Sequence, residues 1–203
     1  MIGIIDYGSG NFTSVCNAVD SIGKEYSPID TPEAFDKASH IILPGVGAYN
    51  DCINALKSRQ LFEPLQNILR NDYKFFLGIC VGHQVLSSEG TEFEIGEGLD
   101  IISGCTTKLK VSGRDRLPHI GWNDVEFNPS SPLFKEIENG AAFYFVHSFH
   151  LRADNSSEVI ATTQHSQKIT AAVNYNKVYG VQFHPEKSQK NGLQLLENFS
   201  NLS

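Results

Sequence analysis

A ten-residue stretch, residues 75–84, constrains this chain more than any other. Apolar and aromatic residues fill five of its first six positions, which is typical of a strand buried on both faces. Cys80 ends this run, with Gly78 and Gly82 two positions away on either side. The G-x-C-x-G pattern is a thiol version of the sharp strand-to-helix turn that presents a nucleophile above a sheet. We therefore expect Cys80 to be a nucleophile at the end of a buried strand.

The physical chemistry of such a turn explains its residue types. Glycine is needed on both sides because the turn leaves no room for side chains around a strained central residue. The helix expected after Cys80 directs its first N–H groups and its dipole at the sulfur, which favours the reactive thiolate. The alternative is a buried structural cysteine between two ordinary glycines.

Charge and hydrophobicity exclude several classes of protein. The 203 residues carry a formal net charge of −7 without a stripe of Lys or Arg, so nucleic acid is not an expected partner. No apolar segment approaches the ~20 residues that a membrane-spanning helix needs. The first apolar run, Ile2 to Ile5, is closed by Asp6 and lacks a basic leader, so we interpret it as a strand rather than a signal peptide.

The four cysteines stand apart from one another and form no C-x-x-C pair. This spacing argues against a zinc site and a disulfide framework, and it fits a reducing cytoplasm. The length suits one well-packed unit, and the sequence has no linker, repeat or low-complexity segment. We therefore expect residues 1–203 to form a single domain.

Strand and helix patterns alternate over the first ninety residues. The strand patterns lie at 2–5, 40–43 and 75–79, and the helical patterns at 12–22, 48–57 and 63–69. This alternation predicts an α/β fold with a mostly parallel central sheet flanked by helices.

After Gly90, closely spaced β-prone segments replace the alternation. They cover residues 99–102, 106–111, 141–149, 158–163, 169–175 and 178–183, and a final helical pattern covers 188–199. Such spacing implies hairpins, one of them turning at 174–177. The sheet is therefore expected to gain antiparallel strands in this half.

A second glycine-rich turn, P-G-V-G at 44–47, follows the strand at 40–43. The carboxyl ends of buried parallel strands are where α/β folds bind ligands, so its N–H groups are candidates for binding, although an ordinary strand-to-helix turn is the alternative. The loop at 7–11 lacks the G-x-x-x-x-G-K-[ST] frame, which makes a phosphate loop a weak interpretation.

Among the seven histidines, His184 is the best placed to act as a base for Cys80. An apolar strand pattern delivers it to the carboxyl edge of the sheet, and Pro185 ends the strand there. Glu186 follows two positions on, so both side chains can lie on one side of an extended chain. A carboxylate that accepts from one ring nitrogen would leave the other nitrogen for the thiol. Alone, H-P-E at 184–186 is typical of a capped turn. Together with the sharp strand-to-helix turn (the nucleophile elbow) at Cys80, it favours a Cys80–His184–Glu186 triad.

Three motifs together resemble the signatures of class I, or triad-type, glutamine amidotransferases. They are P-G-V-G at 44–47, G-I-C-V-G-H-Q at 78–84 and V-Q-F-H-P-E at 181–186, in that family's order. Within the family, the chain is most similar to the glutaminase subunits of imidazole glycerol phosphate synthase, from histidine biosynthesis. That likeness runs from end to end, through I-D-Y-G-S-G-N at 5–11, L-P-G-V-G-A at 43–48, L-P-H-I-G-W-N at 117–123, F-Y-F-V-H-S-F at 143–149 and G-V-Q-F-H-P-E-K-S at 180–188.

The resemblance implies a hydrolytic mechanism without a metal or an organic cofactor. Cys80 would attack the side-chain amide of L-glutamine to give a thioester and ammonia, His184 would shuttle the proton, and Glu186 would orient His184. The oxyanion would be held by backbone N–H groups of Val81 and of Gly45, Val46 and Gly47. In this subfamily the latter strand needs rearrangement before its N–H points inward. Gln84, Ser148 and Phe149 would bind the substrate.

The resemblance also implies a partner, a (β/α)₈ cyclase subunit that receives the ammonia through its barrel. Asn11, Trp122 and Lys187 match family positions at that interface, whereas His119 and His147 are interpreted as structural. Without the resemblance, a lone tryptophan beside glycine is a core residue or a generic interface anchor.

Departures from the family pattern leave alternatives open. His83 stands where the subfamily usually has methionine, Ser9 replaces a frequent proline, and G-L-D at 98–100 replaces G-L-G. A paralogous subunit for amidino-sugar synthesis in surface polysaccharides is therefore the first alternative. A catalytically silent docking subunit and a stand-alone cysteine peptidase are the others; the intact triad argues against the former, and the glutamine-site residues argue against the latter.

Overall fold

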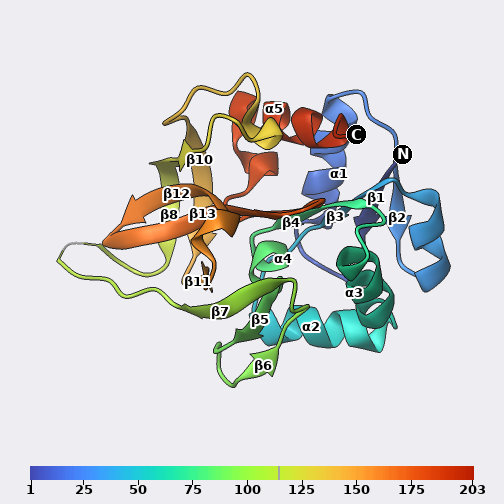
Figure 1. Cartoon of the computed structure of the whole chain (residues 1–203), viewed down its shortest axis with the longest axis horizontal. Helices are drawn as coiled ribbons and strands as arrows, with labels where there is room; N and C mark the ends of the chain where they lie inside the picture. The colour runs from blue at the N-terminus through green and yellow to red at the C-terminus, as the bar shows by residue number, and fades with distance from the viewer. Residues whose placement is uncertain (114) are drawn as a thin grey trace.

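The computed structural model, which describes residues 1–113 and 115–203, is built around an eight-stranded sheet. Its strand order is β2-β1-β3-β4-β14-β13-β12-β9. Helices α1 (Phe12–Ser21) and α5 (Gln189–Ser200) cover one face, and α2 (Tyr49–Ser58) and α3 (Phe62–Arg70) cover the other (Figure 1). The α/β class expected from the sequence is confirmed.

The parallel half of the sheet carries the apolar strands of the sequence. It contains β2 (Tyr26–Ile29), β1 (Ile2–Ile5), β3 (His40–Leu43), β4 (Phe75–Ile79) and β14 (Val178–Val181). All four pairings between these strands are parallel. Such strands are buried on both faces, which explains why β1, β3 and β14 are uninterrupted runs of buried residues.

The second half adds the antiparallel strands. Strands β13 (Gln167–Tyr175), β12 (Val159–His165) and β9 (Glu126–Phe127) extend the main sheet. Two small sheets lie beside it: β10 (Ala142–His147) pairs with β8 (His119–Asp124), and β11 (Phe149–Ala153) joins β7 (Ile102–Lys108), β5 (Ser87–Gly90) and β6 (Gly96–Glu97). The expected hairpin is confirmed, because Tyr175 pairs with Val178 around a two-residue turn.

Several element boundaries differ from the sequence expectations. The strand expected over 141–149 is two strands in different sheets, β10 and β11, with Ser148 between them. The segments expected at 99–102 and 106–111 are replaced by one strand, β7, because pairing with β11 and β5 sets its ends. Edge strand β2 was not predicted, because it contains Pro28 and is half exposed and so shows no apolar strand pattern. Proline is tolerated at this position because an edge strand has one side without a neighbouring strand.

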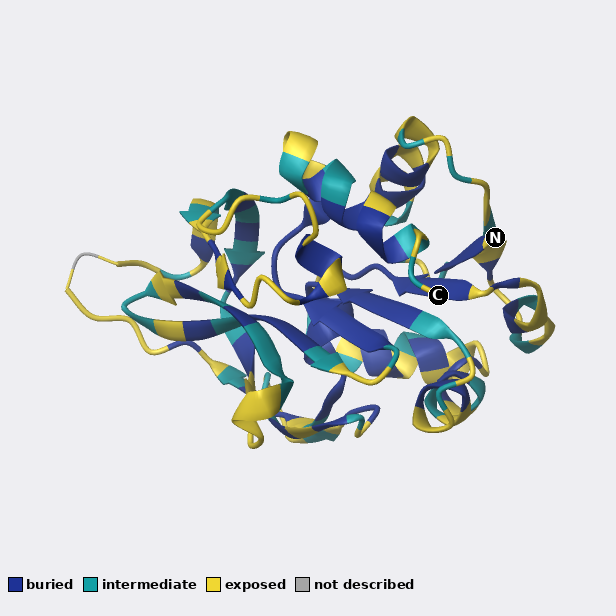
Figure 2. Cartoon of the chain, turned by 45° about the horizontal axis from the view of Figure 1, so that its top comes forward, coloured by how far each residue is buried: buried dark blue, intermediate teal, exposed yellow. Residues whose placement is uncertain are grey.

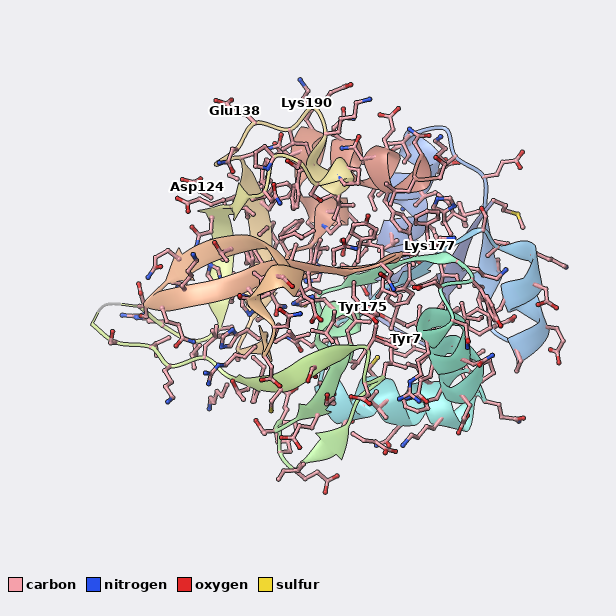
Figure 3. The ribbon with its side chains drawn as sticks, in the orientation of Figure 1. Tyr7, Asp124, Glu138, Tyr175, Lys177 and Lys190 are labelled. Carbon is pink, nitrogen blue, oxygen red and sulfur yellow. The ribbon has the colours of Figure 1, made fainter. Side chains whose placement is uncertain are left out.

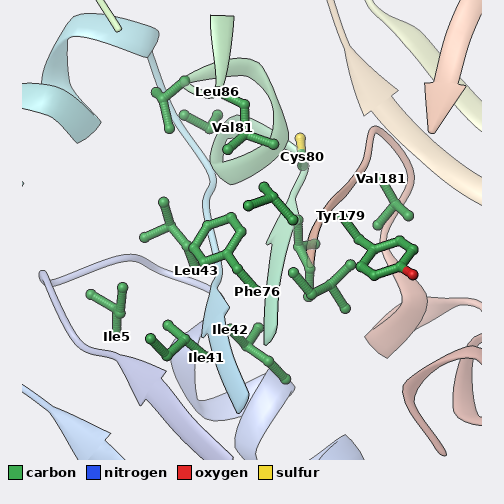
Figure 4. Packing of buried hydrophobic residues seen from close by; sticks show 14 of the residues in the cluster. Ile5, Ile41, Ile42, Leu43, Phe76, Cys80, Val81, Leu86, Tyr179 and Val181 are labelled. Carbon is green, nitrogen blue, oxygen red and sulfur yellow. The ribbon is translucent and has the colours of Figure 1, made fainter. Parts of the chain in front are cut away.

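The hydrophobic core lies on both faces of the parallel strands. Fully buried side chains of β1, β3 and β4, among them Ile5, Ile42 and Phe76, pack together beneath the residues that follow β4 (Figure 4). Burial is greatest along the central strands and on the inward sides of the helices, while loops and outer helix faces are exposed (Figure 2). The carboxyl ends of β3, β4 and β14 are therefore rigidly held.

None of the helices in the described part of the chain has the length and hydrophobicity required to cross a lipid bilayer.

Candidate active site

Cys80 lies where β4 gives way to the one-turn helix α4 (Val81–Gln84), as Figure 4 shows. Its φ of 53° and ψ of −103° are strained for a residue with a side chain. A Cβ on Gly78 would lie 2.2 Å from the carbonyl oxygen of Gly82, and one on Gly82 would lie 2.1 Å from that of Leu43. Backbone atoms cannot yield to such contacts, so both glycines are required for this sharp turn.

His184 and Glu186 lie at the end of the neighbouring strand β14, in and beside the 3-10 helix Pro185–Lys187. Nδ1 of His184 is 2.8 Å from Oε1 of Glu186, and both side chains are fully buried. Nδ1 therefore donates to the carboxylate, and Nε2, which has no hydrogen-bond partner, is left for the neighbouring Cys80. The structure brings the three expected residues together.

The charges of this group reinforce one another. Burial disfavours a charged imidazole, but the adjacent Cys80 sulfur and Glu186 carboxylate outweigh it and raise the pKa of His184 to about 10. Burial also opposes ionisation of Glu186, yet the contacts with His184 and Asn11 hold the pKa of its carboxyl below the usual value. At neutral pH, Glu186 is ionised and His184 carries a proton that it can deliver.

Asn11 has a different position from the one expected. Its side chain is only 3% exposed, and its Nδ2 donates to Oε1 of Glu186 at 3.0 Å. Ser9 Oγ donates to Oδ1 of Asn11, which fixes the orientation of the amide. This burial does not fit the expected contact with a partner subunit; it fits a residue that holds the carboxylate beside His184.

A cavity of about 300 Å³ opens directly over Cys80. The expected binding residues Val46, Gly47, Val81, Gln84, Ser148 and Phe149 all line it, as do Glu92, Val146, His147 and Lys187. Gly45 does not line the cavity. It is packed beneath the rim, where a Cβ would lie 2.8 Å from the backbone nitrogen of Gly82.

The loop at 44–47 forms one side of this cavity. Val46 is 38% exposed, and Gly47 has a φ of +110°, a conformation that favours glycine. Val81 provides the first N–H of α4, which no residue within that helix can accept. Val46, Gly47 and Val81 thus bring the backbone of two elements to the cavity beside the sulfur.

Besides His147, two further polar residues of the site were not identified as site residues from the sequence. Gln182 is fully buried; its Oε1 accepts from Nε2 of Gln84 at 3.1 Å, and its Nε2 is 3.7 Å from Sγ of Cys80. Glu92 lies in the loop between β5 and β6 and accepts from the backbone N–H of Tyr49 at 2.9 Å. Gln182 falls inside the V-Q-F-H-P-E motif, which is a usable signal, whereas nothing in the sequence singles out Glu92.

The other two residues expected at a partner interface lie together on the surface. Trp122 is 49% exposed and packs edge-on against the ring of Tyr144, at 6.0 Å between centroids. Nζ of Lys187 lies 6.0 Å from the centroid of the same ring. Lys187 also lines the cavity, so this surface adjoins the mouth of the site.

The described residues contain no group of three or more His, Cys, Asp or Glu side chains arranged to hold a metal ion.

Comparison with known proteins identifies the family. The family model for glutamine amidotransferase class-I matches residues 3–201. The chain belongs to the class I glutamine amidotransferases. Members of this family use a catalytic triad with a cysteine nucleophile.

Full-length relatives and solved structures agree with this assignment. A protein of Agrobacterium fabrum named imidazole glycerol phosphate synthase subunit HisH is 42% identical, with 98% of this amidotransferase and 97% of the relative covered. One of Methanococcus maripaludis, named subunit HisH 2 of the same synthase, is 38% identical over 98% of both chains. A crystal structure of a glutamine amidotransferase matches with a TM-score of 0.76 at 18% identity over 98% of both chains, which shows the shared fold. The structure of PurLQS from Thermotoga maritima also has a TM-score of 0.76, at 20% identity, with 98% of this chain and 97% of that chain covered.

Proposed function

We propose that this chain is the glutaminase subunit of an imidazole glycerol phosphate synthase in histidine biosynthesis. In this role it hydrolyses L-glutamine to glutamate and passes the ammonia to a separate (β/α)₈ cyclase subunit. The observation that carries the proposal is the buried Cys80–His184–Glu186 group beneath an amino-acid-sized cavity. Relatives of 36–42% identity that cover nearly the full chain and bear this synthase's name support the pathway.

The reaction follows from the protonation states of the site. In the reactive form the thiol proton of Cys80 resides on His184, so a thiolate sulfur attacks the side-chain carbonyl carbon of glutamine. The negative charge that develops on the oxygen is stabilised by the N–H of Val81 and by an N–H of the loop at 44–47. Protonated His184 gives its proton to the departing nitrogen, so ammonia leaves and a thioester forms. His184, now neutral, takes a proton from water, which attacks the thioester and releases glutamate.

The cavity lining supports glutamine as the substrate. Gln84 lies one helical turn after Cys80, and its Nε2 is held by the carbonyl of Phe149 at 2.8 Å. Glu92 provides a carboxylate at the cavity, which suits the ammonium group of an amino acid. Ser148 lies between strands β10 and β11, and Phe149 is the first residue of β11. These two residues are proposed to hold the amino-acid end of the substrate.

The surface beside the cavity is the proposed cyclase interface. Trp122 and Lys187, both packed on Tyr144, would contact the partner, because aromatic anchors are common at the centres of interfaces. We propose that residues 1–203 act as one amidotransferase domain in the cytoplasm, where the four free cysteines would stay reduced.

The test is glutamate release from glutamine by the purified chain, alone and with the cyclase of the same organism plus its ribonucleotide ligand. Stimulation by that pair is expected. Alkylation of Cys80 by a glutamine-like electrophile without stimulation would keep the glutaminase and reject the histidine pathway. Neither hydrolysis nor labelling would reject the glutaminase itself.

A further inference from the structure

His147 lines the glutamine cavity, and its hydrogen bond to His119 extends a chain of two histidines away from that cavity. His119 and His147 face each other at the end of the β8–β10 ladder, and they are only 4% and 5% exposed. The triad uses neither of them. Their hydrogen bonds nevertheless end on a carbonyl that lines the substrate cavity, that of Phe149.

The hydrogen bonds fix the proton positions in both rings. Nδ1 of His147 is 2.8 Å from the carbonyl oxygen of Phe149, which can only accept, so Nδ1 carries the proton. Burial lowers the pKa of His147 to about 3, so the ring is neutral and its Nε2 accepts. Nδ1 of His119, 2.9 Å away, must therefore be the donor to His147.

Asn123 and His119 form the part of this hydrogen-bond chain that lies further from the cavity. Burial lowers the pKa of His119 to about 4, so its Nε2 is an acceptor as well. Asn123 Nδ2 lies 3.1 Å from that nitrogen and also donates to the carbonyl of Gln164 at 2.9 Å. The three hydrogen bonds therefore run in one direction: Asn123 donates to His119, His119 donates to His147, and His147 donates to the carbonyl of Phe149.

The inner end of this hydrogen-bond chain, the Phe149 carbonyl, lies at the substrate site. The Phe149 carbonyl that accepts from His147 also accepts from Nε2 of Gln84 at 2.8 Å. Gln84 is bound in turn to Gln182, whose Nε2 contacts the sulfur of Cys80. Moving the Phe149 carbonyl would therefore turn the amide of Gln84 in the cavity.

The outer end belongs to strand β8, whose alternate residues face solvent. Ile120 is 59% exposed and Trp122 is 49% exposed, and Asp124 ends the strand at the edge of the molecule (Figure 3). The ring of His119 is clamped by stacking on Phe145 at 4.8 Å and on His165 at 4.2 Å between centroids. These two contacts restrict rotation of the His119 ring, so a shift of β8 would move the hydrogen bond that His119 makes to His147.

We propose that His119 and His147 are positioning residues for glutamine, which tie the exposed strand β8 to the carbonyl that orients Gln84. This revises the purely structural role expected for them from the sequence. It rests on the proposed function, because it assigns Gln84 to a glutamine site. It also gives a partner that contacts Trp122 a route to the substrate cavity.

Matched variants of His119 separate the hydrogen bond from the bulk of the ring. The amide nitrogen of asparagine lies near the place of Nδ1, and that of glutamine lies near the place of Nε2. His119→Asn therefore keeps the donor to His147, whereas His119→Gln removes it and leaves Nε2 of His147 unpaired. His147→Phe removes both bonds while retaining an aromatic ring.

The first readout is the glutamine concentration that halves the rate of Cys80 alkylation by iodoacetamide in the full-length chain, followed on the Cys80 peptide by mass spectrometry. We expect His119→Gln, which loses one buried hydrogen bond, to need about fivefold to tenfold more glutamine, and His147→Phe, which loses two, to need at least as much. His119→Asn should match the wild type within about twofold. In the complex with the cyclase, KM for glutamine should rise by the same factor with little change in kcat.

Equal protection in all variants would overturn this inference and leave the glutaminase intact. So would equal impairment of His119→Asn and His119→Gln, because it would show that only the ring matters. If glutamine neither protects Cys80 of the wild-type chain from alkylation nor is hydrolysed by it, the proposed function is overturned, and this inference with it.

Discussion

Replacing Asn11 by alanine tests how the carboxylate of the triad is held. The variant removes the 3.0 Å bond from Asn11 Nδ2 to Oε1 of Glu186, a side chain with no exposed surface. Oε2 of Glu186 has no partner in the structure, so His184 would then be the sole group bound to this buried charge. A hydrogen bond to a charged group contributes about 1.5–3 kcal/mol, so the free energy of unfolding should fall by about that amount.

The same loss should appear in catalysis. About 1.4 kcal/mol corresponds to a factor of ten in rate. If the full free energy of this bond stabilises the transition state, kcat/KM for glutamine should fall by about 10- to 100-fold. Asn11→Asp should be worse, because it sets a second carboxylate against Glu186. Asn17→Ala, at an exposed position of helix α1, which begins directly after Asn11, is the matched control and should stay within about 0.5 kcal/mol of the wild type.

Thermal unfolding of the isolated chain and glutamate release by the complex measure the two effects. Wild-type stability and wild-type kcat/KM in Asn11→Ala would refute the argument. Weaker binding of the cyclase with unchanged stability of the isolated chain would instead restore the interface role that the sequence suggested for Asn11.

Two further predictions concern pH and the strand-to-helix turn. The pKa of His184 is raised from its ordinary value near 6.5 to about 10, so its stabilising charge is fully present below about pH 6.5 and is lost as the pH rises through 10. The Tm difference between wild type and His184→Gln should therefore shrink between pH 6.5 and 10; a constant difference would contradict the ion pair. Gly82→Ala should lower the free energy of unfolding by about 1–3 kcal/mol or more, since its Cβ would meet the Leu43 carbonyl at 2.1 Å; denaturant melts without a change in midpoint would contradict the crowding.

The sequence predicted those parts of the site that lie within single local patterns. The elbow glycines and the H-P-E turn each depend on a few adjacent residues, and strands β4 and β14 then bring Cys80 and His184 together because they are neighbours in the sheet. The parallel sheet of the first half could be predicted for the same reason, because each strand and each helix there is recognisable from its own local residue pattern.

The parts that the sequence could not predict depend on long-range packing. Asn11 reaches Glu186 across 175 positions, so its burial follows from how α1 lies against the 3-10 helix Pro185–Lys187. His119 and His147 looked structural because only the register of β8 against β10 sets them face to face. Glu92 belongs to a loop, and loops carry no periodicity that would aim a side chain at a cavity.

The measurement that tests the central claim most directly is a comparison of two ammonia sources in the complex of this chain with its cyclase. Cys80→Ala should abolish synthesis that depends on glutamine while leaving synthesis from added ammonium salt at the wild-type rate. Equal loss of both activities would contradict a pure glutaminase role. Retention of glutamine-dependent synthesis would contradict Cys80 as the nucleophile.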